Sequence, residues 1–136
     1  MSRFAVHVLF IDDEREVLDG IARLLRSRCP TWTKTFVHEP LEALKIYAQM
    51  QHGLHIVVCD ISMPQISGLQ IMRAIKERTP RIGVIALSGQ LDIASLKGVQ
   101  KFADAHLCKP VDVDVLCTAV EGVYQRKWLE PAGDAG

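Results

Sequence analysis

The chain has 136 residues, of which 49% are apolar, 24% are charged and 6% are aromatic. This length and composition fit one ordinary globular domain, and two full domains would not fit. Lysine plus arginine number 16, as do aspartate plus glutamate, so the formal net charge is zero. The chain therefore lacks the charge of a protein that binds nucleic acid non-specifically, and we expect no direct nucleic-acid binding.

Apolar segments of strand length alternate along the chain with longer segments of helical period. The strands are expected over residues 6–11, 31–37, 54–59, 82–87 and 105–108. The helices are expected from Asp13 to before Pro30, from Pro40 onward, and over 69–78, 91–102 and 112–128. Five strand-helix units predict an α/β fold with a parallel sheet and helices on both faces.

The helical period also predicts which side chains face the core. The first helix should bury Val17, Ile21, Leu24 and Leu25; the second Leu41, Leu44 and Ala48; the last Leu116, Ala119, Val120 and Val123. Gly98 costs about 1 kcal/mol relative to alanine inside a helix, so the fourth helix should be the least stable.

No apolar run approaches the roughly 20 residues that cross a bilayer, and no membrane association is expected. The N-terminal residues 1–4 carry a single cation and no cleavage site follows them, so we expect a cytoplasmic protein. Four cysteines without a C-x-x-C pair should be buried thiols, neither disulfides nor zinc ligands: Cys29, Cys59, Cys108 and Cys117. His52 and His55 have helical ligand spacing without a nearby carboxylate, which favours a surface pair.

Polar residues follow four of the predicted strands. Asp12 and Asp13 follow the first strand, Asp60 the third, Ser88 the fourth and Lys109 the fifth. In a parallel sheet these positions share one edge, where ligands bind. Two carboxylates 4 Å apart repel by about 4 kcal/mol at an effective dielectric of 20, so the cluster requires a cation. Hard oxygen ligands in small number favour Mg²⁺.

These groups fit phosphoryl transfer onto a carboxylate. Asp60 at its ordinary pKa is ionised at neutral pH and can act as the nucleophile without a general base. Lys109 and the Ser88 hydroxyl would stabilise charge on the transferring group. The sequence contains neither G-x-x-x-x-G-K-[ST] nor G-x-G-x-x-G, so a nucleotide is not the expected donor.

Four motifs carry a family resemblance: residues 9–14, residues 57–64 followed by Gly68, residues 86–89, and residues 109–110. With these motifs the sequence resembles the receiver domain of bacterial two-component response regulators. The receiver domain should cover residues 4–128. The resemblance implies the three-layer, flavodoxin-like fold of the chemotaxis regulator, with strand order 2-1-3-4-5.

The resemblance also implies roles for individual residues. Asp60 would accept a phosphoryl group from a phosphohistidine on a sensor histidine kinase or phosphotransfer protein. Asp13, Asp60 and the carbonyl of Ser62 would bind Mg²⁺, with Asp12 acting through metal-bound water. Lys109 and Ser88 would contact the phosphoryl oxygens. The peptide bond before Pro110 would be cis.

The expected output is a change in binding, so the chain would not be a conventional enzyme, although slow autodephosphorylation is compatible with this role. Ser88 and His106 would form the switch, with His106 where the family usually has Tyr or Phe. The fourth helix, fifth strand and fifth helix would form the surface for an output partner that the sequence does not identify. The resemblance also allows a phosphorylation-dependent dimer.

Alternatives remain at this point. Residues 129–136 fit either the flexible tail of a free-standing receiver, which we prefer, or the start of a linker to an output domain. A non-phosphorylated pseudo-receiver is disfavoured by the intact Asp12–Asp13 pair, Asp60 and Lys109. A phosphatase of the haloacid-dehalogenase type would need a second aspartate where Ile61 and Ser62 follow Asp60.

Overall fold

The computed structural model describes residues 3–89 and 93–130. The expected start of the fourth helix at residue 91 and most of the tail over 129–136 lie outside the described residues. Within the described ranges, no helix combines the length and the apolar character needed to cross a membrane.

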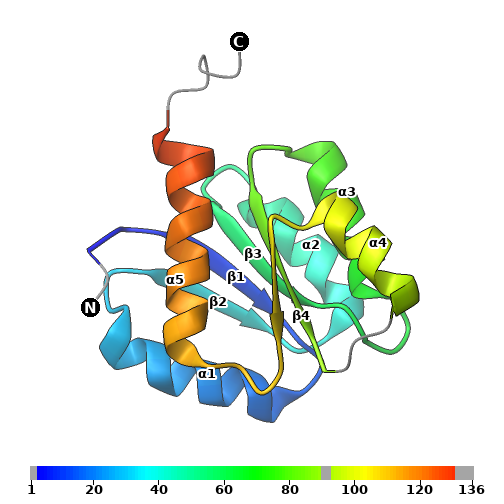
Figure 1. The fold of residues 1–136 in the computed structure, drawn as a ribbon, viewed down its shortest axis with the longest axis horizontal. Coiled ribbons are helices and arrows are strands. Elements are labelled where there is room, and N and C mark those ends of the chain that lie inside the picture. The colour runs from blue at the N-terminus through cyan, green and yellow to red at the C-terminus, as the bar shows by residue number, and fades with distance from the viewer. Residues whose placement is uncertain (1–2, 90–92, 131–136) are drawn as a thin grey trace.

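One parallel sheet forms the centre of the molecule, with strand order β2-β1-β3-β4-β5 (Figure 1). Its strands are β1 (His7–Ile11), β2 (Thr33–Val37), β3 (Ile56–Asp60), β4 (Gly83–Ser88) and β5 (Ala105–Cys108). Every residue of β3 and β4 is buried, which fits central strands covered on both faces. The predicted fold class and strand order are confirmed.

Helices cover both faces of the sheet, which gives three layers (Figure 1). They are α1 (Arg15–Arg28), α2 (Pro40–Met50), α3 (Gly68–Arg78), α4 (Ile93–Phe102) and α5 (Val113–Tyr124). The residues that α1 and α5 bury belong to one hydrophobic cluster, and those of α2, α3 and α4 belong to the other. The sheet therefore separates two apolar cores.

Local sequence explains where three helices begin. Pro40 occupies the first turn of α2, where its missing N–H needs no partner. The Ser67 side chain and Gln70 form a capping box at the start of α3. The Asp112 carboxylate accepts two backbone N–H groups at the start of α5. These residues fix the helix starts relative to the preceding strands.

Two predicted core positions were wrong. Leu24 is 47% exposed and Leu41 is 63% exposed. The buried stripe of α1 runs through Leu18, Ile21 and Leu25, and that of α2 through Pro40, Ala43 and Tyr47. Each mispredicted leucine is one residue off its stripe, a rotation of about 100° around the helix. Tyr47 can be buried because its hydroxyl lies 2.5 Å from Thr79 Oγ1.

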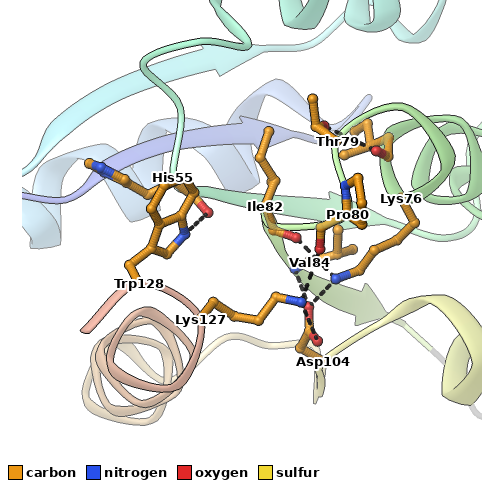
Figure 2. Close-up of polar contacts among 10 residues, drawn as sticks. His55, Lys76, Thr79, Pro80, Ile82, Val84, Asp104, Lys127 and Trp128 are labelled. Carbon is orange, nitrogen blue, oxygen red and sulfur yellow. Dashed lines mark hydrogen bonds and ion pairs between the residues drawn. The ribbon is translucent and has the colours of Figure 1, made fainter. Parts of the chain in front are cut away.

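The last helix continues beyond α5 as a π-helical turn, η1 (Gln125–Leu129). This turn packs at the amino-terminal ends of the strands, as Figure 2 shows. Trp128 Nε1 donates a hydrogen bond to the His55 carbonyl at 3.1 Å, and the Arg81 guanidinium lies 4.2 Å from the Trp128 ring. His55 is thus half-buried, and its prediction as part of a surface pair was wrong.

The cysteines divide into two groups. Cys29 and Cys59 are buried as predicted, but Cys117 is half-buried and Cys108 is exposed. Cys108 ends β5, which pairs with β4 alone and forms an edge of the sheet. An edge position exposes the side chain that a central strand would bury.

Candidate functional site

The register of the sheet brings the predicted polar residues to one edge. Asp60 is the last residue of β3 and lies opposite Leu87 of β4. Asp12 follows β1, which pairs with β3, and Ser88 ends β4. Lys109 follows β5, and its N–H donates to the Ser88 carbonyl at 2.8 Å. The carboxyl ends of β1, β3, β4 and β5 therefore define the candidate site.

Four acidic side chains gather at this edge. Asp12, Asp13, Glu14 and Asp60 each place a carboxylate oxygen within 4.8 Å of the others. Asp12 is 0% exposed and Asp60 is 2% exposed, whereas Glu14 lies at the surface. Glu14 was not among the predicted site residues. Its only sequence signal is its position directly after the aspartate pair.

One ammonium group faces three of these carboxylates. Lys109 Nζ lies 2.8 Å from Asp12 Oδ2, 2.9 Å from Glu14 Oε1 and 3.3 Å from Asp60 Oδ2. The lysine side chain is 13% exposed, so little water screens these contacts. Since one positive charge cannot balance several carboxylates, the cluster as described keeps an excess of negative charge.

Backbone groups fix the two buried aspartates. The Glu14 N–H donates to Asp12 Oδ1 at 2.8 Å, and the Ser62 N–H donates to Asp60 Oδ1 at 3.2 Å. Gly68 at the start of α3 packs against the backbone of Asp60, where a Cβ would collide with the Asp60 carbonyl oxygen. A larger residue at position 68 would therefore displace the loop that carries Ser62.

The environment changes the protonation equilibria of the site. Burial and the negative charge of Asp12 raise the pKa of Asp60 to about 6, against the opposing effects of Lys109 and the Ser62 N–H. Burial acts to lower the pKa of Lys109, but the close contacts with the carboxylates of Asp12 and Glu14 and the charge of Asp60 raise it above its ordinary range. At pH 7 the site therefore holds a cationic lysine and a mainly ionised Asp60.

The donor atoms fit a hard divalent cation. Asp12 Oδ2 is buried and receives no well-aligned hydrogen bond from any described residue; its neighbour is the Lys109 ammonium. Carboxylate oxygens at a partly open edge suit Mg²⁺, which keeps several water ligands. An additional positive charge would also relieve the repulsion between Asp12 and Asp60.

The Ser88 hydroxyl is engaged with the predicted switch residue. Ser88 is 2% exposed, and its Oγ lies 2.7 Å from His106 Nε2. His106 lies opposite Ala86 of β4 and is half-buried. The two residues that the sequence predicted as a switch are therefore in direct contact. The peptide bond between Lys109 and Pro110 is cis, the isomer that the family resemblance implies.

Comparison with known proteins places these features in a family. The family model described as the response regulator receiver domain matches residues 8–121. The chain belongs to this family. A receiver domain from Clostridium thermocellum is 31% identical, with a TM-score of 0.83 over 91% of this chain and 98% of that one. A receiver domain protein from Methanospirillum hungatei shares the fold at 18% identity, with a TM-score of 0.82 over 94% of this chain and 100% of that one.

Curated relatives are longer proteins. The chain is 32% identical to the sensor kinase CckA of Brucella abortus over 88% of this chain and 13% of the kinase. It is 24% identical to the cell cycle response regulator CtrA of Brucella ovis over 89% of this chain and 51% of that protein. The transcriptional regulatory protein YesN of Bacillus subtilis is 26% identical over 85% of this chain and 32% of YesN. The chain thus spans about half or less of these relatives.

Proposed function

We propose that this receiver domain accepts a phosphoryl group on Asp60 from a phosphohistidine of a sensor histidine kinase or phosphotransfer protein. The observation that carries the proposal is the environment of Asp60. Its Oδ2 lies 3.3 Å from the Lys109 ammonium, within an acidic cluster that has more negative than positive charge. Membership in the receiver family and the similarity to a sensor kinase support this class of donor.

The reaction forms an acyl phosphate. An oxygen of the Asp60 carboxylate attacks phosphorus, the phosphorus–nitrogen bond of the phosphohistidine breaks, and the electron pair stays on the departing imidazole. Asp60 Oδ1 is held by the Ser62 N–H, which leaves Oδ2 as the oxygen nearer Lys109. Lys109 would bind a phosphoryl oxygen and stabilise the negative charge of the transferring group.

The acidic cluster would hold Mg²⁺ during this step. Asp13, Asp60 and the Ser62 carbonyl are the proposed ligands, and Asp12 would act through bound water. The ion would supply positive charge toward the phosphoryl oxygens. Asp12 Oδ2 supports this assignment because the described residues leave it buried with an ammonium neighbour and no aligned hydrogen bond.

The output would start from the Ser88–His106 contact. For its hydroxyl to donate to a phosphoryl oxygen on Asp60, Ser88 must give up or rearrange the 2.7 Å contact with His106 Nε2. His106 lies on β5, so the change reaches the surface of α4, β5 and α5. We propose that phosphorylation shifts this surface toward a minor state that an output partner binds. In this role the chain acts by binding and is not a conventional enzyme.

Incubation with Mg²⁺ and acetyl phosphate, followed by intact mass measurement, tests the acceptor role. Wild-type protein should gain the mass of one phosphoryl group, and Asp60→Asn should gain none. The matched control Asp19→Asn changes an exposed aspartate of α1 and should be labelled like wild type. Equal labelling of Asp60→Asn, or no labelling of the folded wild-type protein, would contradict the proposal.

Hydrogen exchange with and without a phosphoryl mimic, beryllofluoride, tests the output surface. We expect altered protection in α4, β5 and α5 of the wild-type protein. His106→Phe keeps a ring and removes the nitrogen that contacts Ser88, so it should change the response of β5. Changes confined to α1 and α2 would show that this surface is not the output.

A further inference from the structure

Two cysteines that the phosphoryl-transfer site does not use lie in contact between α1 and α5. Cys29 caps the C-terminal end of α1, and its N–H donates to the Leu25 carbonyl at 2.8 Å. Cys117 lies in the first half of α5. The two Sγ atoms are 3.2 Å apart, although the residues are 88 positions apart in the sequence. A disulfide needs a separation of about 2.0 Å, so a small approach suffices.

The surrounding contacts hold these helix ends together. Arg28, next to Cys29, forms an ion pair with Asp114 in the first turn of α5. Lys34 Nζ donates to the Cys29 carbonyl at 3.1 Å and anchors the other side of the helix end. The ion pair links the end of α1 to the start of α5 beside the two sulfurs, and Lys34 ties the same end of α1 to β2.

We propose that Cys29 and Cys117 form a redox modification site, which closes to an intramolecular disulfide in the presence of a small-molecule disulfide such as oxidised glutathione. This site is separate from the acidic cluster. Its formation does not depend on the proposed phosphoryl transfer, so failure of either proposal leaves the other standing.

The different burial of the two cysteines sets the order of the reaction. Cys29 is 1% exposed, whereas Cys117 is half-buried. Burial, the contact with Cys117 and nearby negative charge raise the pKa of Cys29 to about 12, which keeps it a thiol at neutral pH. Cys117 is therefore the sulfur that an external disulfide reaches first.

The reaction proceeds in two balanced exchange steps. In the first step Cys117 Sγ loses its proton and attacks one sulfur of oxidised glutathione; a mixed disulfide forms, and one glutathione leaves and takes up the proton. In the second step Cys29 gives up its proton to solvent as its sulfur attacks Cys117 Sγ, and the bond between Cys117 and glutathione breaks. Glutathione leaves as a thiolate and takes up a proton. Because the pKa of Cys29 is raised, this step should be the slower of the two and should speed up as the pH rises. Two protein thiols are oxidised, and one glutathione disulfide is reduced to two thiols.

The disulfide would join the end of α1 covalently to α5. These helices follow the two segments that build the candidate site, since α1 comes after Asp12 and Asp13 and α5 comes after Lys109. The oxidised protein should resist separation of the two helices. Because the bond also restricts the unfolded chain, oxidation should raise the melting temperature by roughly 5–15 °C.

The test uses the 136-residue chain with Cys108→Ser, because the exposed thiol of Cys108 would otherwise react and obscure the mass change. Treatment of the folded protein with oxidised glutathione should lower the intact mass by about 2 Da, the loss of two hydrogens. Digestion without reductant should yield one cross-linked pair of peptides containing Cys29 and Cys117. Dithiothreitol should restore the original mass and melting temperature.

Two further variants in the Cys108→Ser background make the result specific. Cys29→Ala should stop at a stable glutathione adduct on Cys117, and Cys117→Ala should form no internal disulfide. Circular dichroism confirms that each variant is folded. The proposal is overturned if the folded Cys108→Ser protein keeps its thiols or stops at the glutathione adduct. It is also overturned if Cys29→Ala still loses two hydrogens.

Discussion

At the carboxyl ends of the strands, four carboxylates lie close together and three of them contact the Lys109 ammonium. At the amino ends, among the residues described, the Asp104 carboxylate lies between two ammonium groups. At the first end a buried carboxylate oxygen of Asp12 has no aligned hydrogen bond. At the second end Asp104 Oδ2 accepts from both Lys76 Nζ, at 2.7 Å, and the Val84 N–H, at 2.8 Å.

Figure 2 shows how the amino-end contacts continue outward. Lys76 Nζ also donates to the Ile82 carbonyl at 3.0 Å. Lys127 Nζ donates to the Pro80 carbonyl at 3.0 Å and lies 3.8 Å from Asp104 Oδ1. Burial lowers the pKa of Lys76, and the Asp104 carboxylate opposes that shift. Two ammonium groups share one carboxylate at this end, and each of these charged groups has hydrogen-bond partners within the protein.

This difference in partners distinguishes the candidate site at the carboxyl ends from the charge network at the amino ends. When a buried charge has all its partners, removal of one partner leaves the other groups buried and unpaired, which destabilises the fold. When a buried charge has too few partners, it destabilises the fold without a ligand and favours binding of a ligand of opposite charge. Removal of a carboxylate should therefore lower the free energy of unfolding at the amino end and raise it at the carboxyl end.

The largest expected effect on stability is at the amino ends of the strands. Asp104→Ala removes the acceptor of the Val84 N–H and the carboxylate that pairs with Lys76, and should lower the free energy of unfolding by about 2–3 kcal/mol. Urea denaturation at pH 7 measures this loss. Asp19→Ala, at an exposed position of α1, should change it by less than about 0.5 kcal/mol. A similar small effect for Asp104→Ala would show that the network is not structural.

The second expected effect is an increase in the free energy of unfolding, on removal of the Asp60 charge. In the folded state without Mg²⁺, the pKa of Asp60 is raised from 3.8 to about 6, so ionisation of Asp60 destabilises the fold. Asp60→Asn should therefore raise the free energy of unfolding at pH 7 by about 2 kcal/mol.

The pH dependence of that gain provides the check. Below pH 3.8 Asp60 is protonated in both states, and the stability advantage of a neutral side chain disappears. The difference between Asp60→Asn and wild type should thus be largest above pH 6 and should close as the pH falls toward 4. A destabilised Asp60→Asn protein at pH 7 would remove the contrast between the two ends.

Mg²⁺ should offset the excess of negative charge at the carboxyl ends of the strands and so stabilise the fold. At ten times its dissociation constant, Mg²⁺ should stabilise the wild-type protein by about 1.4 kcal/mol, because it binds only the folded state. Asp13→Ala removes a proposed ligand and should show no such shift at the same concentration. Asp19→Ala serves as the control and should respond like wild type. Equal affinity of Asp13→Ala and wild type in calorimetry would contradict the assignment of Asp13.

The two ends also differed in how far sequence could predict them. Asp12, Asp60 and Lys109 directly follow apolar strands, so the parallel topology alone predicts that they meet. Asp104 and Lys76 are 28 residues apart, and no local pattern marks them as partners. Their contact depends on how α3 packs against the loop before β5.

Packing also decided the features that sequence analysis missed. The periods of α1 and α2 allow two neighbouring stripes, and only the fit against the sheet selects Leu18 over Leu24. The approach of Cys29 and Cys117 depends on how the end of α1 meets α5. A sequence motif records which residues follow a strand, but it does not record the rotation of a helix or the meeting of two helix ends.

The smallest expected effect tests whether the amino end depends on neutral as well as charged partners. His55 Nδ1 accepts a hydrogen bond from the His7 N–H at 3.0 Å, which requires an unprotonated nitrogen. Burial, with the nearby charges of His7 and Arg81, lowers the pKa of His55 below its ordinary value of 6.5. The unfolded chain therefore binds more protons than the folded protein just below pH 6.5, and this contribution to stability is lost as the pH falls.

The size of the loss should be about 1 kcal/mol, the contribution of one hydrogen bond of this kind. His55→Asn offers an acceptor that does not titrate, so the difference in unfolding free energy between wild type and this variant should shrink between pH 7 and pH 5.5. The difference is the quantity to measure, because Asp60 contributes the opposite slope over part of the same range. His52→Asn, at an exposed position, should retain the wild-type pH dependence. If His55→Asn and wild type lose stability in parallel as the pH falls, the acceptor nitrogen of His55 does not contribute to the stability of the amino end. That stability would then depend on Asp104 and its lysines.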